Sequence, residues 1–181
     1  MTRFMSTLLN GSLFLSFCVF FFNIYILVMC MKGLKQYIIT GIVLVSVLGT
    51  FLHFAYDLSG NNFFVALFTP VNESIWEHTK LIFFPMLLYS LYLNKKLKAE
   101  YPCISSAMLF GSLLGVLLII VLFYTYSGII GYHVAFVDIA IFYISVIASF
   151  YVAYKLTLSC KAQDFVVVLQ ALNILMICLV G

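Results

Sequence analysis

Long apolar runs separated by short turns are the feature that most constrains how this chain folds. The first run, Leu8 to Met31, contains no charged residue, and about 20 apolar residues are enough for a helix to cross a bilayer core of about 30 Å. Only 8% of the 181 residues are charged, whereas a soluble domain carries about 25%. The sequence therefore predicts an all-α integral membrane protein built as a helical bundle.

We predict six transmembrane helices in a single domain that covers the whole chain, residues 1–181. Their predicted ranges are residues 8–30, 37–57, 70–94, 104–126, 134–154 and 165–181. The last range is at the short limit for a span, so we expect the chain to be slightly truncated there. In the fourth helix, the spacing Gly111-x-x-x-Gly115 predicts close approach of another helix.

The start of the third helix is preceded by a short apolar piece, FFVALF, at residues 63–68. This piece is too short to cross a bilayer, so we expect it to lie at the membrane interface. Thr69 as N-cap and Pro70 at the first helical position predict the start of the third helix. A second possible start is the capping box Ser74-x-x-Glu77, one turn later.

The lysines predict the orientation of the chain in the cell membrane. Three alternate turns between the predicted helices contain lysines: Lys32 and Lys35, then Lys95, Lys96 and Lys98, then Lys155 and Lys161. The other two turns between helices contain no lysine or arginine. Basic turns lie on the cytoplasmic side, which places both termini outside the cell. The net charge of +3 is too small to indicate a nucleic-acid partner.

The cysteines show no spacing that is typical of a bridge or a metal site. Most of the five lie in or beside apolar runs, and none forms a CxxC pair. Cysteine in such positions behaves as a small apolar residue. We therefore expect neither a disulfide nor a thiolate metal site.

One stretch, TPVNESIWEHTK at residues 69–80, concentrates charge in this apolar chain. The apolar run that follows it is too short to span alone, so the third helix must include these residues. This places Glu77, His78 and Lys80 one or two turns below the outer surface. Other ionisable or hydroxyl side chains reach the same depth on neighbouring helices: His53, Asp57, Tyr124, Tyr126, His133 and Asp138. Charged side chains avoid lipid, so we expect His53, Asp57, Glu77, His78 and Asp138 to converge in a pocket open to the outside.

The pocket residues suggest both functional and purely structural roles. A divalent metal such as zinc suits imidazole and carboxylate ligands, and the candidates are His53, Asp57, Glu77, His78, His133 and Asp138. As catalytic groups we consider Glu77, Asp57, His78 and Lys80, with Lys80 setting the charge state of the two acids. The structural alternative is that Glu77 and Lys80 only neutralise each other, that Asn72 and Glu73 belong to the helix start, and that Tyr124 and Tyr126 are interfacial aromatics.

Two strings, HFAYDLSGN…ALFTPVNESIWEHTKLIFFPMLLYS and FYTYSGIIG, resemble a family of small bacterial multi-pass membrane proteins that is known only as a domain of unknown function. The similarity covers most of the chain, from the second to the fifth predicted helix. The resemblance implies a bacterial membrane setting and a self-contained domain. It implies no catalytic residue, because the family has no assigned activity.

Three functions are compatible with these patterns. The first is a metal-dependent enzyme that acts on a lipid or an envelope molecule at the outer leaflet, although no HExxH spacing supports it. The second is a proton- or cation-coupled transporter, although the sequence shows no internal repeat. The third is a non-catalytic membrane subunit or sensor whose outer pocket binds a small-molecule ligand or a partner. The sequence leaves the oligomeric state open.

Overall fold

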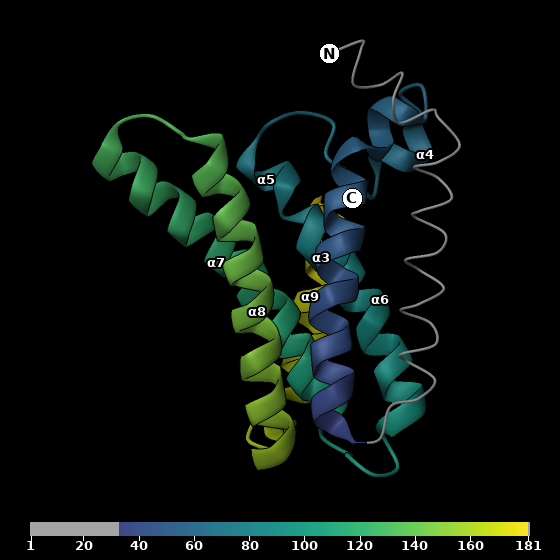
Figure 1. The fold of residues 1–181 in the computed structure, drawn as a ribbon. Helices are drawn as coiled ribbons and strands as arrows, with labels where there is room; N and C mark the ends of the chain where they lie inside the picture. The colour runs from purple at the N-terminus through teal and green to yellow at the C-terminus, as the bar shows by residue number, and fades with distance from the viewer. Residues whose placement is uncertain (1–32, 181) are drawn as a thin grey trace. The chain divides into compact units, whose positions relative to one another are not determined.

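The computed structural model describes residues 33–180, and within this range the chain forms helices and turns without any strand (Figure 1). Contacts divide the chain into two units, residues 1–40 and residues 41–181. The second unit holds all of the elements described below, apart from the first residues of one helix that continues across the division. That the whole chain is one domain stays a prediction.

Within residues 33–180, four stretches are long and apolar enough to cross a membrane, namely α3, α7, α8 and the stretch Gln163–Val180. This confirms the predicted class, a helical membrane protein. The predicted helix at residues 8–30 lies outside the described residues. In order, the elements are α3 (Leu34–Leu58), α4 (Phe63–Ala66), α5 (Ile75–His78), α6 (Lys80–Leu97), α7 (Ile104–Ile130), α8 (Ala135–Ser159), the 3-10 helix η1 (Gln163–Phe165) and α9 (Val166–Val180).

The predicted start of the third helix at Thr69 and Pro70 is wrong. Thr69 is buried, and its hydroxyl donates a hydrogen bond to the Val65 carbonyl at 2.8 Å instead of capping a helix. Residues 70–74 are not helical. The second possible start is the observed one, since the Ser74 side chain accepts a hydrogen bond from the Glu77 amide at 3.3 Å at the N-terminus of α5. A turn at Thr79 then separates α5 from α6.

Close packing around α7 follows from its glycines, as predicted. A Cβ atom on Gly115 would lie 2.6 Å from Cδ1 of Ile82 and 2.8 Å from Oγ of Ser149. A Cβ atom on Gly111 would lie 3.1 Å from the backbone oxygen of Ser149. The two glycines therefore allow α6 and α8 to approach α7 more closely than side chains would permit.

Hydrogen bonds between polar side chains connect α9 and η1 to α7. Ser112 Oγ donates to Asn173 Oδ1 at 2.7 Å, and Asn173 Nδ2 donates to the Leu109 carbonyl at 3.2 Å. Ser106 Oγ lies 2.9 Å from Gln163 Oε1. Asn173, Ser106 and Ser112 are all buried, so these bonds satisfy polar groups that would otherwise be costly in an apolar interior.

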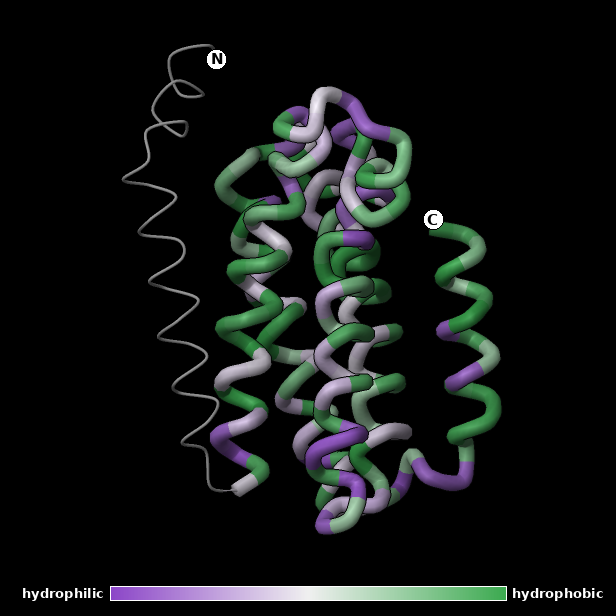
Figure 2. Tube along the Cα trace, turned by 90° about the vertical axis from the view of Figure 1, so that its right-hand side faces the viewer, coloured by the Kyte–Doolittle hydropathy of each residue, from purple (hydrophilic) through white to green (hydrophobic). Residues whose placement is uncertain are grey.

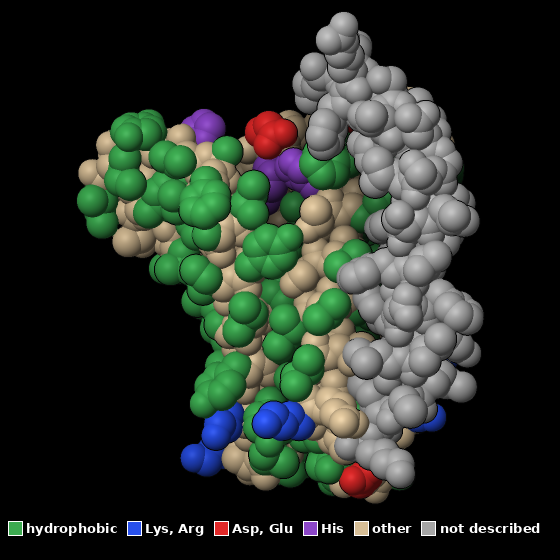
Figure 3. Space-filling model, in the orientation of Figure 1, with side chains coloured by type: hydrophobic (Ala, Val, Ile, Leu, Met, Phe, Trp, Pro, Cys, Tyr) green, Lys and Arg blue, Asp and Glu red, His purple; other side chains and the backbone are tan. Residues whose placement is uncertain are grey.

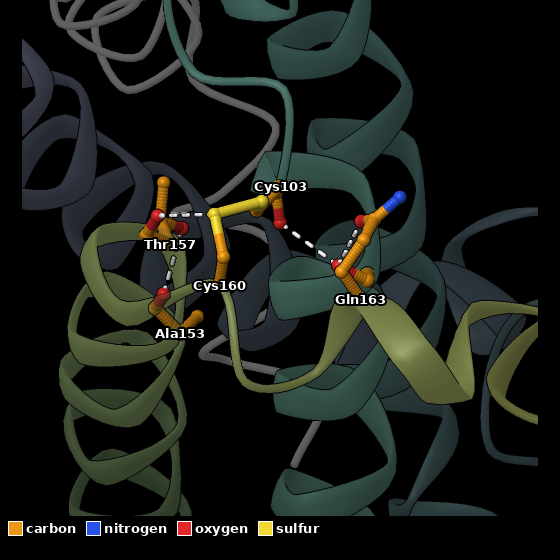
Figure 4. Close-up of a disulfide and its surroundings, with 6 residues drawn as sticks. Cys103, Ala153, Thr157, Cys160 and Gln163 are labelled. Carbon is orange, nitrogen blue, oxygen red and sulfur yellow. Dashed lines mark hydrogen bonds between the residues drawn. A yellow bond between two sulfur atoms is a disulfide. The ribbon is translucent and has the colours of Figure 1, made fainter.

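A disulfide joins Cys103 to Cys160, so the expectation of no disulfide is wrong (Figure 4). Cys103 precedes α7, and Cys160 follows α8 in a left-handed backbone conformation that ends this helix. The bond depends on how α7 and α8 pack together, and the two residues are 57 positions apart in sequence. For this reason no local spacing in the sequence indicates it.

The two ends of residues 41–181 differ in chemistry. Figure 1 shows α4, α5 and the α7–α8 turn at one end, and the α8–α9 turn at the other. Hydrophobic residues prevail along the middle of the helices, and hydrophilic residues gather mostly at the ends (Figure 2). On the face drawn in Figure 3, histidines lie at the end of α4 and α5, whereas lysines lie at the opposite end.

Candidate functional site

The loop before α5 presents the site residues. Asn72 Oδ1 accepts a hydrogen bond from the Ser74 amide at 3.0 Å, and Ser74 in turn caps α5. The loop is thus fixed by an Asx turn at Asn72 and a helix cap at Ser74, which Asn and Ser commonly form. As a result, Glu73 lies in the loop just before the helix, while Glu77 and His78 lie within it.

Three side chains form a group that could hold a metal ion, namely His53 from α3, Glu73 from the loop and His78 from α5. One potential ligand atom of each lies within 4.8 Å of the other two. The rings of His53 and His78 are 5.2 Å apart between centroids. His78 Nε2 lies 3.5 Å from Glu73 Oε2, close to the roughly 3.3 Å that separates two ligands held about 2.0–2.1 Å from a tetrahedral zinc ion.

The hydrogen bond at the other ring nitrogen of His78 makes its Nε2 available as a ligand. His78 Nδ1 lies 2.8 Å from the Ser74 carbonyl oxygen and donates its proton there. In the neutral ring, Nε2 then carries a lone pair that faces the carboxylate of Glu73. The lone pair of Nε2 and the carboxylate oxygen would repel each other, unless a cation lies between them or Nε2 carries a proton. Donation of the second ring N–H to a backbone carbonyl is also the usual arrangement for a histidine that binds metal.

A small pocket of about 50 Å³ opens beside this group. It is lined by His53, Asp57 and Glu73 together with Tyr56, Pro70, Val71 and Asn72. The carboxylate of Asp57 is exposed and makes no hydrogen bond or ion pair with any residue from 33 to 180. The pocket therefore combines two possible metal ligands with a carboxylate that remains available to a bound molecule.

Glu77 is engaged in a different set of contacts. Its Oε2 atom lies 2.9 Å from Lys80 Nζ and accepts a hydrogen bond from the Val71 amide at 3.2 Å. Lys80 also donates to the Ala66 carbonyl at 3.1 Å. The pair thus connects α5 and α6 to α4 and to the loop that carries Glu73. This arrangement favours the structural alternative for Glu77 and Lys80 over a direct catalytic role.

Asp138 and His133 form a second cluster at the α7–α8 turn. The Tyr126 hydroxyl donates a hydrogen bond to Asp138, whose other oxygen lies 3.7 Å from His133 Nδ1. The Val134 amide donates to the Tyr126 hydroxyl at 3.2 Å, so the cluster closes the turn. Among the described residues, neither Asp138 nor His133 belongs to the group of His53, Glu73 and His78. Tyr124 is exposed and packs edge-on against Phe123.

Glu73 is the member of the metal group that the sequence analysis did not include among the candidate metal ligands. A helix that begins at Pro70 would place Glu73 and Glu77 on one face, four residues apart. Because the loop up to Ser74 is not helical, the two carboxylates separate, and Glu73 rather than Glu77 meets the histidines. The signal that indicates this is the capping box at Ser74, which starts the helix after Glu73.

Comparison with known proteins identifies a protein family. A family model described as "Family of unknown function (DUF6512)" matches residues 26–180. No curated protein matches the chain, and no solved structure matches it.

Proposed function

We propose that this chain, which belongs to the family of unknown function DUF6512, is a bacterial membrane protein that binds a zinc-like divalent metal through His53, Glu73 and His78. The observation that carries the proposal is the 3.5 Å approach of His78 Nε2 to Glu73 Oε2, with Nδ1 of the same ring bonded to a backbone carbonyl. Two histidines and one glutamate are a ligand set of catalytic zinc sites, which keep one position open. We therefore assign the site to catalysis rather than to a structural metal.

The reaction class that fits the site is hydrolysis. Zinc in such a site supplies an activated water molecule. Asp57 lines the adjoining pocket. In the proposed reaction its carboxylate accepts the proton that water loses when it attacks an ester. The same carboxyl group then returns this proton to the departing alcohol, so one ester and one water give one acid and one alcohol.

The substrate class follows from the surroundings of the site. Phe63 and Phe64 on α4 are 72% and 73% exposed, and Trp76 on α5 is 40% exposed. An exposed tryptophan is typical of the level of the lipid headgroups, and the exposed phenylalanines add apolar surface beside it. An ester of a membrane lipid or of an envelope molecule can reach a site at this level. By the lysine distribution, we place this end of the molecule outside the cell.

Metal content tests the proposal directly. The purified full chain is incubated with zinc, desalted and analysed by mass spectrometry for bound metal. We expect about one equivalent in the parent protein and a loss of at least tenfold in His53→Ala and in His78→Ala. His133→Ala is the matched control, because this histidine lies in the separate turn cluster and should not alter the metal content.

Two results would overturn parts of the proposal. A parent protein that holds no more zinc than the His78→Ala variant has no metal site, and the Glu73–His78 contact is then an ordinary ion pair. A protein that binds zinc but does not hydrolyse lipid esters in vesicles has the metal site without the reaction. In that case the third function considered from the sequence, a non-catalytic sensor or subunit, replaces the enzyme.

A further inference from the structure

An apolar pocket lies at the lysine end of residues 41–181, opposite the candidate metal site. Its volume is about 330 Å³, and apolar side chains from three helices line it together with the side chain of Lys161: Phe110 on α7, Leu156 on α8, and Ala162, Phe165, Val168 and Leu169 on or before α9. The proposed hydrolytic function does not involve this pocket.

Two cross-links fix the walls of this pocket. The first is the disulfide between Cys103 and Cys160, which holds the α8–α9 turn against the start of α7 (Figure 4). Cys160 is the residue directly before Lys161 in the sequence. The second is the hydrogen bond of 2.9 Å between Ser106 on α7 and Gln163, the first residue of η1. It holds the backbone next to Ala162 against α7. The pocket is therefore formed by the fold itself and does not require a ligand to bring its walls together.

The charge of Lys161 selects the kind of ligand. Lys161 is exposed and makes no ion pair with any of residues 33–180. A cation without a partner, at the edge of a cavity whose other walls are apolar, complements a molecule with an acyl chain and an anionic headgroup. Lys155 and the lysines at the end of α6 add positive charge to the same end of the molecule, where basic residues attract anionic lipids.

We infer that this pocket binds an anionic phospholipid, with an acyl chain between Phe110, Leu156 and Val168 and the phosphate at Lys161. The ligand is a lipid of the surrounding bilayer. The proposal requires both parts of the site. The apolar walls without Lys161 would accept any lipid equally, and Lys161 without the walls would act only as one of several surface charges.

Native mass spectrometry of the full chain in detergent tests this inference, with phosphatidylglycerol as the anionic probe and phosphatidylethanolamine as the zwitterionic one. We expect phosphatidylglycerol to bind more tightly, and Lys161→Gln to weaken its binding about fivefold. Lys96→Gln, which removes the same charge from α6 at the same end, is the matched control and should change binding by less than twofold. Val168→Trp fills the pocket with Lys161 unchanged and should also reduce bound phosphatidylglycerol.

Each result supports or overturns the inference. Equal loss in Lys161→Gln and Lys96→Gln means that the attraction comes from the general charge of this end. Unchanged binding in Val168→Trp means that the acyl chain lies elsewhere, and equal binding of the two lipids means that Lys161 selects nothing. Thermal unfolding of each variant shows that the protein is folded, and Val168→Leu replaces Val168→Trp if the tryptophan prevents folding.

Discussion

Lys80 Nζ lies 2.9 Å from Glu77 Oε2, and the two side chains are only 4% and 19% exposed. The carboxylate also accepts the Val71 amide, and the ammonium also donates to the Ala66 carbonyl. Each charge therefore has a partner of opposite charge and a backbone partner, as a buried pair requires. The pair holds the loop between α4 and α5, the segment that presents Glu73 to the histidines.

Glu77→Gln should destabilise the protein. Glutamine keeps the size of the side chain but leaves the Lys80 ammonium buried without a counter-charge, which costs about 3 kcal/mol. The measurement is thermal unfolding of the purified protein in detergent. The double variant Glu77→Gln with Lys80→Met removes both charges and should recover most of the lost stability. If the single variant is as stable as the parent, the pair contributes nothing to the fold.

Glu73→Gln provides the matched comparison, because it makes the same chemical change four residues away. The Glu73 side chain is 87% exposed, so its loss should leave the unfolding temperature within about 2 °C of the parent. Its bound zinc should fall at least tenfold, since the carboxylate ligand is lost. The opposite result is that Glu73→Gln retains zinc, whereas the folded Glu77→Gln variant loses it. The ligand would then be Glu77, as the sequence alone suggests.

Asp57→Asn should separate metal binding from catalysis. Asp57 lines the pocket but is not one of the three residues that form the metal group. We therefore expect the variant to keep about one zinc ion and to lose hydrolysis of lipid esters by about 10²-fold or more, the usual contribution of a general base. Loss of zinc together with activity would instead make Asp57 a ligand.

The sequence predicts the long helices well because their signal is local. The ranges 104–126 and 134–154 correspond to α7 (Ile104–Ile130) and α8 (Ala135–Ser159), and the spacing of Gly111 and Gly115 indicates the close packing of α7. These features depend on composition and period within a single segment. Neither requires knowledge of which helices are neighbours.

The site is less predictable, because it depends on the residue at which the third helix begins and on contacts between separate helices. Placing the start of the third helix at Pro70 instead of Ser74 changes which carboxylate faces the histidines. His53 and His78 come from separate helices, and Cys103 and Cys160 are 57 residues apart. Periodicity places such residues at a shared depth, but it does not determine which of them meet. For that reason the sequence predicts Asp138 beside His53, whereas Asp138 bonds to Tyr126.

Gly115→Leu should destabilise the helix packing. A side chain at this position would meet Ile82 and Ser149 within 3 Å, and overpacking of this kind costs about 1–3 kcal/mol. Gly128→Leu is the control, because Gly128 lies in the same helix and a Cβ atom added to it would have no neighbour within 4 Å. The unfolding temperature should fall for Gly115→Leu and stay the same or rise for Gly128→Leu. Equal effects would mean that α7 does not pack through Gly115.

The orientation of the chain is the remaining question that one experiment can decide, because two features of the lysine end predict opposite compartments. Lys95, Lys96, Lys98, Lys155 and Lys161 indicate the cytoplasm. The Cys103–Cys160 bond at the same end is of a kind that persists in oxidising compartments and is rare in the cytoplasm. Five lysines in two turns outweigh one cysteine pair, so we expect the lysine end inside the cell.

Labelling of intact cells with a membrane-impermeant maleimide tests this orientation. Asn61→Cys, in the turn between α3 and α4, should be labelled above the level of the parent chain. Lys96→Cys should be labelled only after the cells are permeabilised. The reverse pattern would place the metal site in the cytoplasm and the disulfide outside the cell. The hydrolytic site would then act on esters of the inner leaflet, while the contacts of His53, Glu73 and His78 would be unaffected.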